Sequence, residues 1–223
     1  MLVHGAWADG SSWNDVAGPL LRKGFDVVAA PIPLTSLSDD ALALERTVER
    51  TTGSIVLVAH AYAGAVISSV MCVNTRSLVF VAALAPEEGE TVAEVFYRGT
   101  PHPQAPHLAP DDHGLIWLPK QAFGTAFAQN ASPERAALLA ATQRPIALAC
   151  IQEKAPRPAW KLKPSWYLIA EQDRMINPTT QHFMAERMGA RIRSEQVDHT
   201  PLVSAPDPVI EVIFEAARAD ATP

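Results

Sequence analysis

The sequence predicts an α/β fold, with a mostly parallel sheet of about six strands and helices on both of its faces. Short apolar runs rich in β-branched residues alternate along the chain with segments whose apolar residues recur at helical spacing. The clearest case is residues 55–67, where an apolar run ends in small residues and a helix-compatible run follows at once. Alternation of this kind is typical of parallel sheets, whose strands are joined by crossover helices and buried on both faces.

The first part of the chain supplies four of the expected strands. We expect them at residues 1–3, 25–30, 54–59 and 77–83. Between them, helices are expected from Trp13, near Ser38 and over residues 62–73. Their inward-facing residues should be Trp13, Val16, Leu20 and Leu21 in the first helix and Ala41, Leu44 and Val48 in the second. The first strand is unusually short, so we expect the natural chain to begin upstream of Met1.

The alternating order is interrupted and then resumes. Residues 86–164 are rich in proline and hold scattered aromatic residues, with one clear helix start at Ser132-Pro133-Glu134. We interpret this stretch as an inserted cap of short helices and loops. Strands are then expected at residues 165–170 and 191–197, with helices beginning at Asn177 and Asp207. The predicted organisation is an α/β core, residues 1–85 and 165–223, interrupted by a cap.

Composition narrows the class of protein. The formal net charge of −6 disfavours nucleic acid and anionic membrane surfaces as partners, because both attract basic patches. We find no apolar run of the roughly 18 residues needed to span a bilayer and no signal peptide, since polar residues appear by Asp9. The two cysteines, Cys72 and Cys150, are expected to be buried, reduced thiols of a cytoplasmic protein. The expected partner is a small-molecule substrate, and composition leaves a homodimer open.

Two motifs at the ends of expected strands carry a resemblance. Residues 59–63 occupy the place of a strand-to-helix elbow, and His4-Gly5-Ala6-Trp7 closes the first strand. Together with residues 7–13, a late aspartate and a late histidine, they make the chain similar to the α/β-hydrolase superfamily. The similarity is to the branch that holds plant methyl esterases, hydroxynitrile lyases and small bacterial hydrolases, and it covers nearly the whole chain.

The resemblance implies a catalytic arrangement. In this family a serine at the elbow is the nucleophile, and the chain order is nucleophile, acid, base. Here the base is His199 and the residue that orients it is Asp173, with Glu171 and Asp198 as weaker competitors for the acid role. The backbone N–H groups of Ala6 and Tyr62 would stabilise the oxyanion. The function implied is ester or acyl hydrolysis of a small, fairly apolar substrate.

The elbow departs from the family pattern. Gly-x-Ser-x-Gly is replaced by Ala59, Ala61 and Ala63, so the nucleophile position holds Ala61 and has no hydroxyl. Ser68, Ser69 and Cys72 lie too far along the following helix to replace it, and the Tyr62 side chain should point elsewhere. Three explanations stay open. The chain is an inactivated Ser→Ala form of an esterase, a cofactor-free enzyme that uses the His199–Asp173 dyad as a base in dioxygenase- or lyase-like chemistry, or a non-catalytic small-molecule binder.

Other residues complete the predicted site. The residues expected to contact substrate are His4, Gly5, Trp7, His60, Trp117 and Phe123. A histidine- and aspartate-rich stretch, residues 102–113, fits no tight metal-ligand spacing, so a solvated loop is expected there. No glycine-rich nucleotide-binding motif follows an expected strand. We therefore expect neither a metal nor an organic cofactor.

Overall fold

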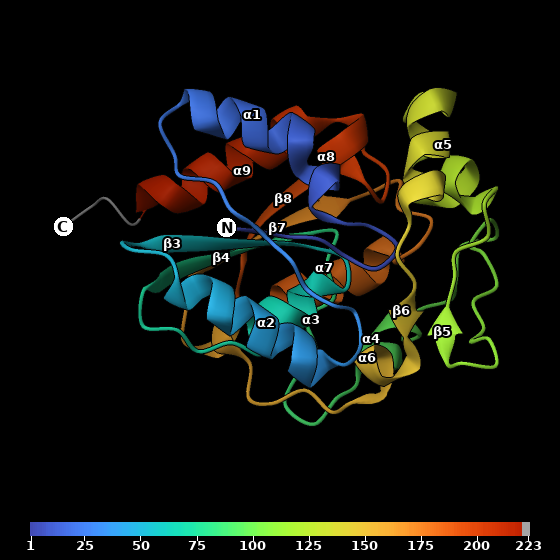
Figure 1. Ribbon diagram of the computed structural model, residues 1–223, viewed down its shortest axis with the longest axis horizontal. Helices are drawn as coiled ribbons and strands as arrows, with labels where there is room; N and C mark the ends of the chain where they lie inside the picture. Colours follow the sequence, from blue (N-terminus) through green and yellow to red (C-terminus); the bar gives the residue numbers. More distant parts are fainter. Residues whose placement is uncertain (220–223) are drawn as a thin grey trace.

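The computed structural model describes residues 1–219, and its centre is a six-stranded parallel sheet in the order β2-β1-β3-β4-β7-β8 (Figure 1). The strands are β1 (Leu2–Val3), β2 (Ala29–Ala30), β3 (Ile55–His60), β4 (Thr75–Val81), β7 (Ser165–Ala170) and β8 (Arg191–Glu195). Each neighbouring pair runs parallel. The predicted α/β class and sheet are confirmed.

Helices cover both faces of this sheet (Figure 1). The helices α1 (Asn14–Arg22) and α9 (Pro206–Ala219) pack on one face, and α2 (Leu37–Glu49), α3 (Ala63–Ser68) and α7 (Pro178–Arg187) pack on the other. Side chains alternate between the faces, so Val58 of β3 joins the first layer whereas Leu57 and Ala59 join the second. The central strands are apolar on both sides because both sides are covered.

Local capping explains where the main helices begin. The Ser36 hydroxyl accepts a hydrogen bond from the Asp39 backbone N–H at the start of α2. At α7, the side chain of Asn177 accepts from the Thr179 N–H and Pro178 takes the first helical position. The start of α7 is the predicted one, whereas α2 begins at Leu37, one residue before the predicted Ser38.

Some predicted boundaries and one predicted inward-facing residue are wrong. Helix α3 ends at Ser68, where the Ser68 and Ser69 hydroxyls donate to carbonyls four residues back, an arrangement that competes with continued helix. Strand β2 is only two residues long, because Phe25 packs against Phe214 of α9 instead of joining the ladder. Leu21 is 56% exposed, although the other three predicted inward residues of α1 and its first turn are buried.

Residues 86–164 lie between β4 and β7 and, within the part of the chain that the structure describes, add no strand to the six-stranded sheet. They form α4 (Val92–Phe96), β5 (Leu115–Ile116), a π-helical turn (Phe123–Phe127), α5 (Pro133–Thr142), β6 (Ile146–Ala147), α6 (Leu148–Gln152) and a 3₁₀ turn (Ala159–Lys161). The strands β5 and β6 pair antiparallel with each other. A 3₁₀ turn (Gly10–Trp13) precedes α1, and α8 (Pro201–Ser204) precedes α9. None of the helices within residues 1–219 combines the length and hydropathy that crossing a bilayer requires.

Candidate active site

The turn between β3 and α3 holds Ala61 in a strained backbone conformation. Ala61 has a φ of +50°, a region that costs free energy for any residue with a Cβ. Its N–H donates to the Val81 carbonyl at 3.3 Å, and its own carbonyl accepts from the Leu84 N–H at 2.9 Å. Both backbone groups are thus fastened to the end of β4 and the loop after it, which keeps the strained turn in place.

Two glycines permit the close packing around this turn. A Cβ at Gly64 would lie 2.4 Å from the Leu84 carbonyl oxygen, so only glycine lets α3 approach that loop. A Cβ at Gly5 would lie 3.0 Å from the Ala61 Cβ and 3.0 Å from the His60 carbonyl oxygen. The loop after β1 therefore reaches the apex of the elbow.

Asp173 and His199 meet next to the same turn. The Nδ1 atom of His199 lies 2.8 Å from Oδ2 of Asp173, and both side chains are buried. Since an ionised carboxylate only accepts hydrogen bonds, Nδ1 carries the proton and Nε2 keeps a free lone pair. Among residues 1–219 no group bonds to Nε2. The pair therefore offers an oriented base to the space beside Ala61.

The Asp173 carboxylate is held by three further donors. Its Oδ1 accepts from the Met175 N–H at 2.7 Å and the Ile176 N–H at 2.9 Å. Its Oδ2 also accepts from the Gln181 amide at 2.8 Å. Together with His199, these donors fix the position of the buried Asp173 carboxylate.

The two competing acids serve other structures. Asp198 accepts from the backbone of Asn130 at 2.8 Å and of Thr200 at 3.2 Å, which shapes the loop that carries His199. Glu171 is half-buried and binds His182 at 2.8 Å and Ser194. Neither carboxylate contacts the His199 ring, so the geometry favours Asp173.

His60, the residue directly before Ala61, holds the backbone of His199 by a hydrogen bond. Its Nε2 lies 2.7 Å from the His199 carbonyl oxygen, so Nε2 carries the proton and donates. Burial, followed by the nearby His199 ring at 4.8 Å, holds the pKa of His60 well below its usual value. A neutral histidine thus ties the His199 loop to the elbow.

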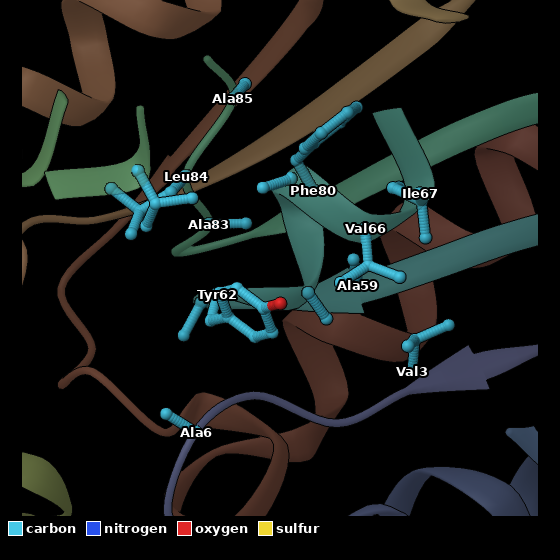
Figure 2. Packing of buried hydrophobic residues seen from close by; sticks show 14 of the residues in the cluster. Val3, Ala6, Ala59, Tyr62, Val66, Ile67, Phe80, Ala83, Leu84 and Ala85 are labelled. Carbon is cyan, nitrogen blue, oxygen red and sulfur yellow. The ribbon is translucent and has the colours of Figure 1, made fainter. Parts of the chain in front are cut away.

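Two backbone N–H groups beside Ala61 are free. Among residues 1–219, neither the Ala6 nor the Tyr62 N–H has a hydrogen-bond acceptor. Both residues line the cavity that also exposes Ala61 and His199, and Figure 2 shows Ala6 and Leu84 on opposite sides of Tyr62. Unpaired donors in a buried place are costly unless a ligand uses them. This arrangement can bind an oxyanion.

The cavity beside these groups is apolar and measures about 600 Å³, including its open mouth. Apart from Ala6, Ala61, Tyr62 and His199, it is lined by Trp7, Leu84, Val92, Ala93, Phe96, Tyr97, Leu108, Ile116, Ile146, Ile151, Met175 and Ile176. His199 is the one lining residue, among those the structure describes, that can carry a positive charge. Such walls suit a small, neutral, apolar ligand.

Several residues predicted to contact substrate lie outside this wall. Trp117 is 48% exposed and donates from its indole to Asp111 at 3.3 Å, so its predicted place in the pocket is wrong. Phe123 does not line the cavity either, because it is buried against Phe127. His4, Gly5 and His60 sit behind the lining and support it. Trp7 lines it, with its indole N–H on the Ile116 carbonyl at 2.9 Å.

Asp40 is a site neighbour that sequence reasoning missed. It appears in the sequence only as an acid in the first turn of a helix, yet its side chain is buried and accepts from the Tyr62 hydroxyl at 2.6 Å. Burial raises the pKa of Asp40 and also that of Tyr62. The nearby Cys150 thiol has its pKa raised to about 12, again chiefly by burial. A buried acid one helix away from the elbow has no local signal in the sequence.

The remaining candidates form no further centre. Among residues 1–219 no group of three or more histidine, cysteine or acidic side chains is placed to hold a metal. In the histidine-rich loop, Asp111 instead accepts from the backbone of His113 and Leu115, each at 2.9 Å. Both cysteines are free thiols, but Cys72 is only half-buried, contrary to expectation.

Known proteins share this sequence pattern. The alpha/beta hydrolase family is matched over residues 1–212. A carbendazim hydrolyzing esterase of Nocardioides sp. (strain SG-4G) is 30% identical over 116 residues. That match covers 45% of this chain and 48% of the esterase, so it spans about half of the relative's length.

Solved structures share the fold. Polyneuridine aldehyde esterase superposes with a TM-score of 0.84 at 17% identity, over 97% of each chain. A methylesterase from Arabidopsis superposes with a TM-score of 0.77 at 17% identity, over 97% of this chain and 98% of the other. This chain therefore has the same fold as these two proteins.

Proposed function

The chain belongs to the alpha/beta hydrolase family, and from that premise we propose that its site is a carboxylic-ester hydrolase site for small, apolar, neutral substrates. The nucleophile position of this site is occupied by Ala61. The observation that carries the proposal is the convergence of three features on one cavity: the strained elbow, the free Nε2 of His199 and two free N–H donors. The esterases that resemble the chain support the reaction class.

With serine at position 61, the groups would act in a known order. The serine oxygen would attack the ester carbonyl while Nε2 of His199 accepts its proton, and Asp173 would stabilise the imidazolium that forms. The N–H groups of Ala6 and Tyr62 would bind the oxyanion. His199 would then protonate the leaving alcohol, and water would release the acid by the same steps.

In the chain as it stands, we propose that this acyl-enzyme route is blocked. Alanine keeps the Cβ of serine and lacks only the oxygen, so the cavity, base and donors can remain in place. Ala61 gains nothing from a φ of +50°, whereas a nucleophile at that position is exposed by it. We therefore infer that Ala61 replaces a serine. Residual catalysis of about 10³-fold over water is what such a base and oxyanion site would retain.

A second candidate follows from the same free nitrogen. A His199–Asp173 base facing an apolar cavity could deprotonate a bound substrate without any nucleophile, as in a cofactor-free dioxygenase- or lyase-like reaction. A binder without catalysis would use the cavity alone. Residues 86–164, which contribute much of the cavity wall, would serve in each case as the proposed cap.

Installing the missing hydroxyl tests the proposal. We expect Ala61→Ser to raise kcat/KM for p-nitrophenyl acetate and butanoate by at least about 10⁴-fold, and we expect His199→Ala in that background to abolish the gain. The matched control is Ala63→Ser, which places a hydroxyl two residues further on, at the first residue of α3 and outside the cavity lining, and should give no gain.

If Ala61→Ser folds, binds the ester and gives no turnover, the hydrolase proposal is rejected. Dioxygen uptake with the unaltered chain would then support the dyad enzyme. Tight binding of the ester without uptake or turnover would support the binder.

A further inference from the structure

Asp40 is a buried carboxylate behind the elbow. It lies in the first turn of α2, is 0% exposed, and accepts from the Tyr62 hydroxyl at 2.6 Å and the Leu34 N–H at 2.6 Å. The Cys150 thiol lies 3.7 Å from the same oxygen that binds Tyr62. Among residues 1–219, the Asp40 carboxylate forms no ion pair with a lysine, arginine or histidine. Burying a carboxylate in this way is costly, so its hydrogen bonds must compensate.

Tyr62 is the residue through which Asp40 reaches the site. It directly follows Ala61, its backbone N–H is one of the two free donors, and its ring lines the cavity. Helix α3, which begins next to it, has six residues and no side-chain cap at its N-terminus. The bond from the Tyr62 phenol to Asp40 is therefore the one side-chain hydrogen bond, among those the structure describes, that ties this end of the helix to another element.

Hydrogen bonds also connect Asp40 with the loop that carries the other free donor, the Ala6 N–H. Leu34, whose N–H binds Asp40, has a φ of +64° and accepts from the Ala147 N–H at 3.0 Å. Arg144 donates to the neighbouring carbonyls of Ile32 and Pro33 at 3.1 and 3.2 Å. The Arg144 carbonyl in turn accepts from the N–H of Trp7, the residue after Ala6. Residues 32–34 are thus linked to both sides of the proposed oxyanion site.

We propose that Asp40 is a positioning residue: by holding the Tyr62 phenol, it fixes the Tyr62 backbone N–H in the direction that binds the developing oxyanion. The role rests on the proposed ester chemistry and extends it, because it assigns donor geometry to a residue on a different helix from the elbow. Oxyanion donors act only when they are held in place before charge develops. A phenol anchored on a buried acid provides such a constraint next to a short, uncapped helix.

A purely structural role makes a different prediction. If Asp40 and Tyr62 only stabilised the fold, removing their bond would lower the free energy of unfolding. It would also lower the affinity of the cavity for every ligand to a similar degree. If they position the N–H, the loss should be concentrated on ligands that place a negative oxygen at the donors. An anion and its neutral isostere therefore separate the two roles.

The first experiment uses the unaltered chain and calorimetric titration with butanoate and butanamide. We expect Tyr62→Phe and Asp40→Asn each to lower the affinity for butanoate by about tenfold and to change the affinity for butanamide by less than twofold. The loss of butanoate affinity in the double variant should be no greater than the larger of the two single-variant losses, because the two residues act as one unit. Equal losses for both ligands, or no loss for butanoate, would overturn the proposal.

The matched control is Ser68→Ala, which removes a buried hydroxyl that donates to the Gly64 carbonyl at 2.7 Å on the same helix. We expect it to lower stability without changing the preference for butanoate. Should Asp40→Asn fail to fold, Tyr62→Phe, which removes a single oxygen, still decides the question.

The second experiment separates this proposal from the proposed function. In the Ala61→Ser background, Tyr62→Phe should lower kcat by about tenfold with KM changed by less than twofold. If Ala61→Ser is inactive while butanoate binding still depends on Tyr62 and Asp40, the esterase function fails and the positioning role stands. If Ala61→Ser is active and neither variant changes kcat or butanoate binding, the positioning role fails and the function stands.

Discussion

The two regions that build the cavity differ in what they contribute. The loops of the sheet supply the polar groups, namely the His199–Asp173 pair and the N–H groups of Ala6 and Tyr62, and defined hydrogen bonds hold the pair in place. Residues 86–164 supply apolar wall, such as Val92, Phe96 and Ile116, and the phenol-bearing ring of Tyr97 at the mouth. In the proposed function, the reacting groups would therefore come from the loops of the sheet, and much of the wall that shapes the substrate would come from residues 86–164.

This separation predicts effects of different size. Changes in the polar groups should alter the rate by orders of magnitude, because each group acts on charge that develops in the reaction. Changes in the wall should alter affinity by small factors, since each removes only part of a contact area. The three predictions that follow are ordered by the size of the expected effect.

The largest effect should come from Asp173. In the Ala61→Ser background we expect Asp173→Asn to lower kcat by about 10³-fold or more, because the amide no longer fixes the productive tautomer of His199. Steady-state kinetics with p-nitrophenyl butanoate measures it. Glu171→Gln changes an acid at the same edge of the sheet that does not contact His199, and its kcat should stay within about threefold of the parent value. The reverse ranking would show that the assignment of the acid is wrong.

An intermediate effect should appear in the pH dependence of stability. Burial lowers the pKa of His60 far below 6.5, so on acidification the unfolded chain binds a proton at this residue before the folded chain does. Stability should therefore fall as the pH drops below about 6.5, by up to about 1.4 kcal/mol per pH unit from His60. His4, whose pKa burial also lowers, adds to the same trend. Asp40, whose pKa is raised, contributes with the opposite sign at lower pH.

Urea unfolding between pH 7 and 5 measures this slope. His60→Gln should flatten it relative to the parent, whereas Ser68→Ala, which removes no titrating group, should shift the curve without changing its slope. An unchanged slope in His60→Gln would contradict a neutral, buried His60.

The smallest effect should distinguish two tryptophans. Trp7→Phe removes the bond to the Ile116 carbonyl that ties a core loop to the inserted segment, and we expect a loss of about 1 kcal/mol in stability and a few-fold rise in KM. Trp117→Phe, at an exposed position, should leave KM within about twofold. Thermal unfolding and ester kinetics in the Ala61→Ser background measure both. A larger effect at Trp117 would place the binding surface outside the cavity.

The sequence was most informative where local pattern and position along the chain agree. The apolar run and small residues at 55–67 predicted the elbow, and the structure has β3 ending at His60 and α3 beginning at Ala63. Asp173 and His199 follow β7 and β8, and parallel strands bring their carboxyl ends to one edge of the sheet. Their meeting at 2.8 Å is therefore foreseeable from chain order.

The sequence was least informative where contacts come from remote segments. The length of β2 depends on the packing of Phe25 against Phe214 of α9, which lies far along the chain. Residues 86–164 have little periodicity, so their strands β5 and β6 were not predicted. Propensity describes a residue and its near neighbours, whereas these outcomes were set by packing across the molecule.

By itself, the sequence determined the α/β class, the places of residues 61, 173 and 199 just after three of the strands, and the absence of a hydroxyl at residue 61. These follow from period, turn residues and chain order, all of which are local or one-dimensional properties. Only the tertiary structure decided which side chains line the cavity and that Asp40, 22 positions before Tyr62, holds its phenol. The physical reason is that a buried polar group takes whichever partner the packing of distant elements brings within hydrogen-bond reach, and no spacing along the chain records that choice.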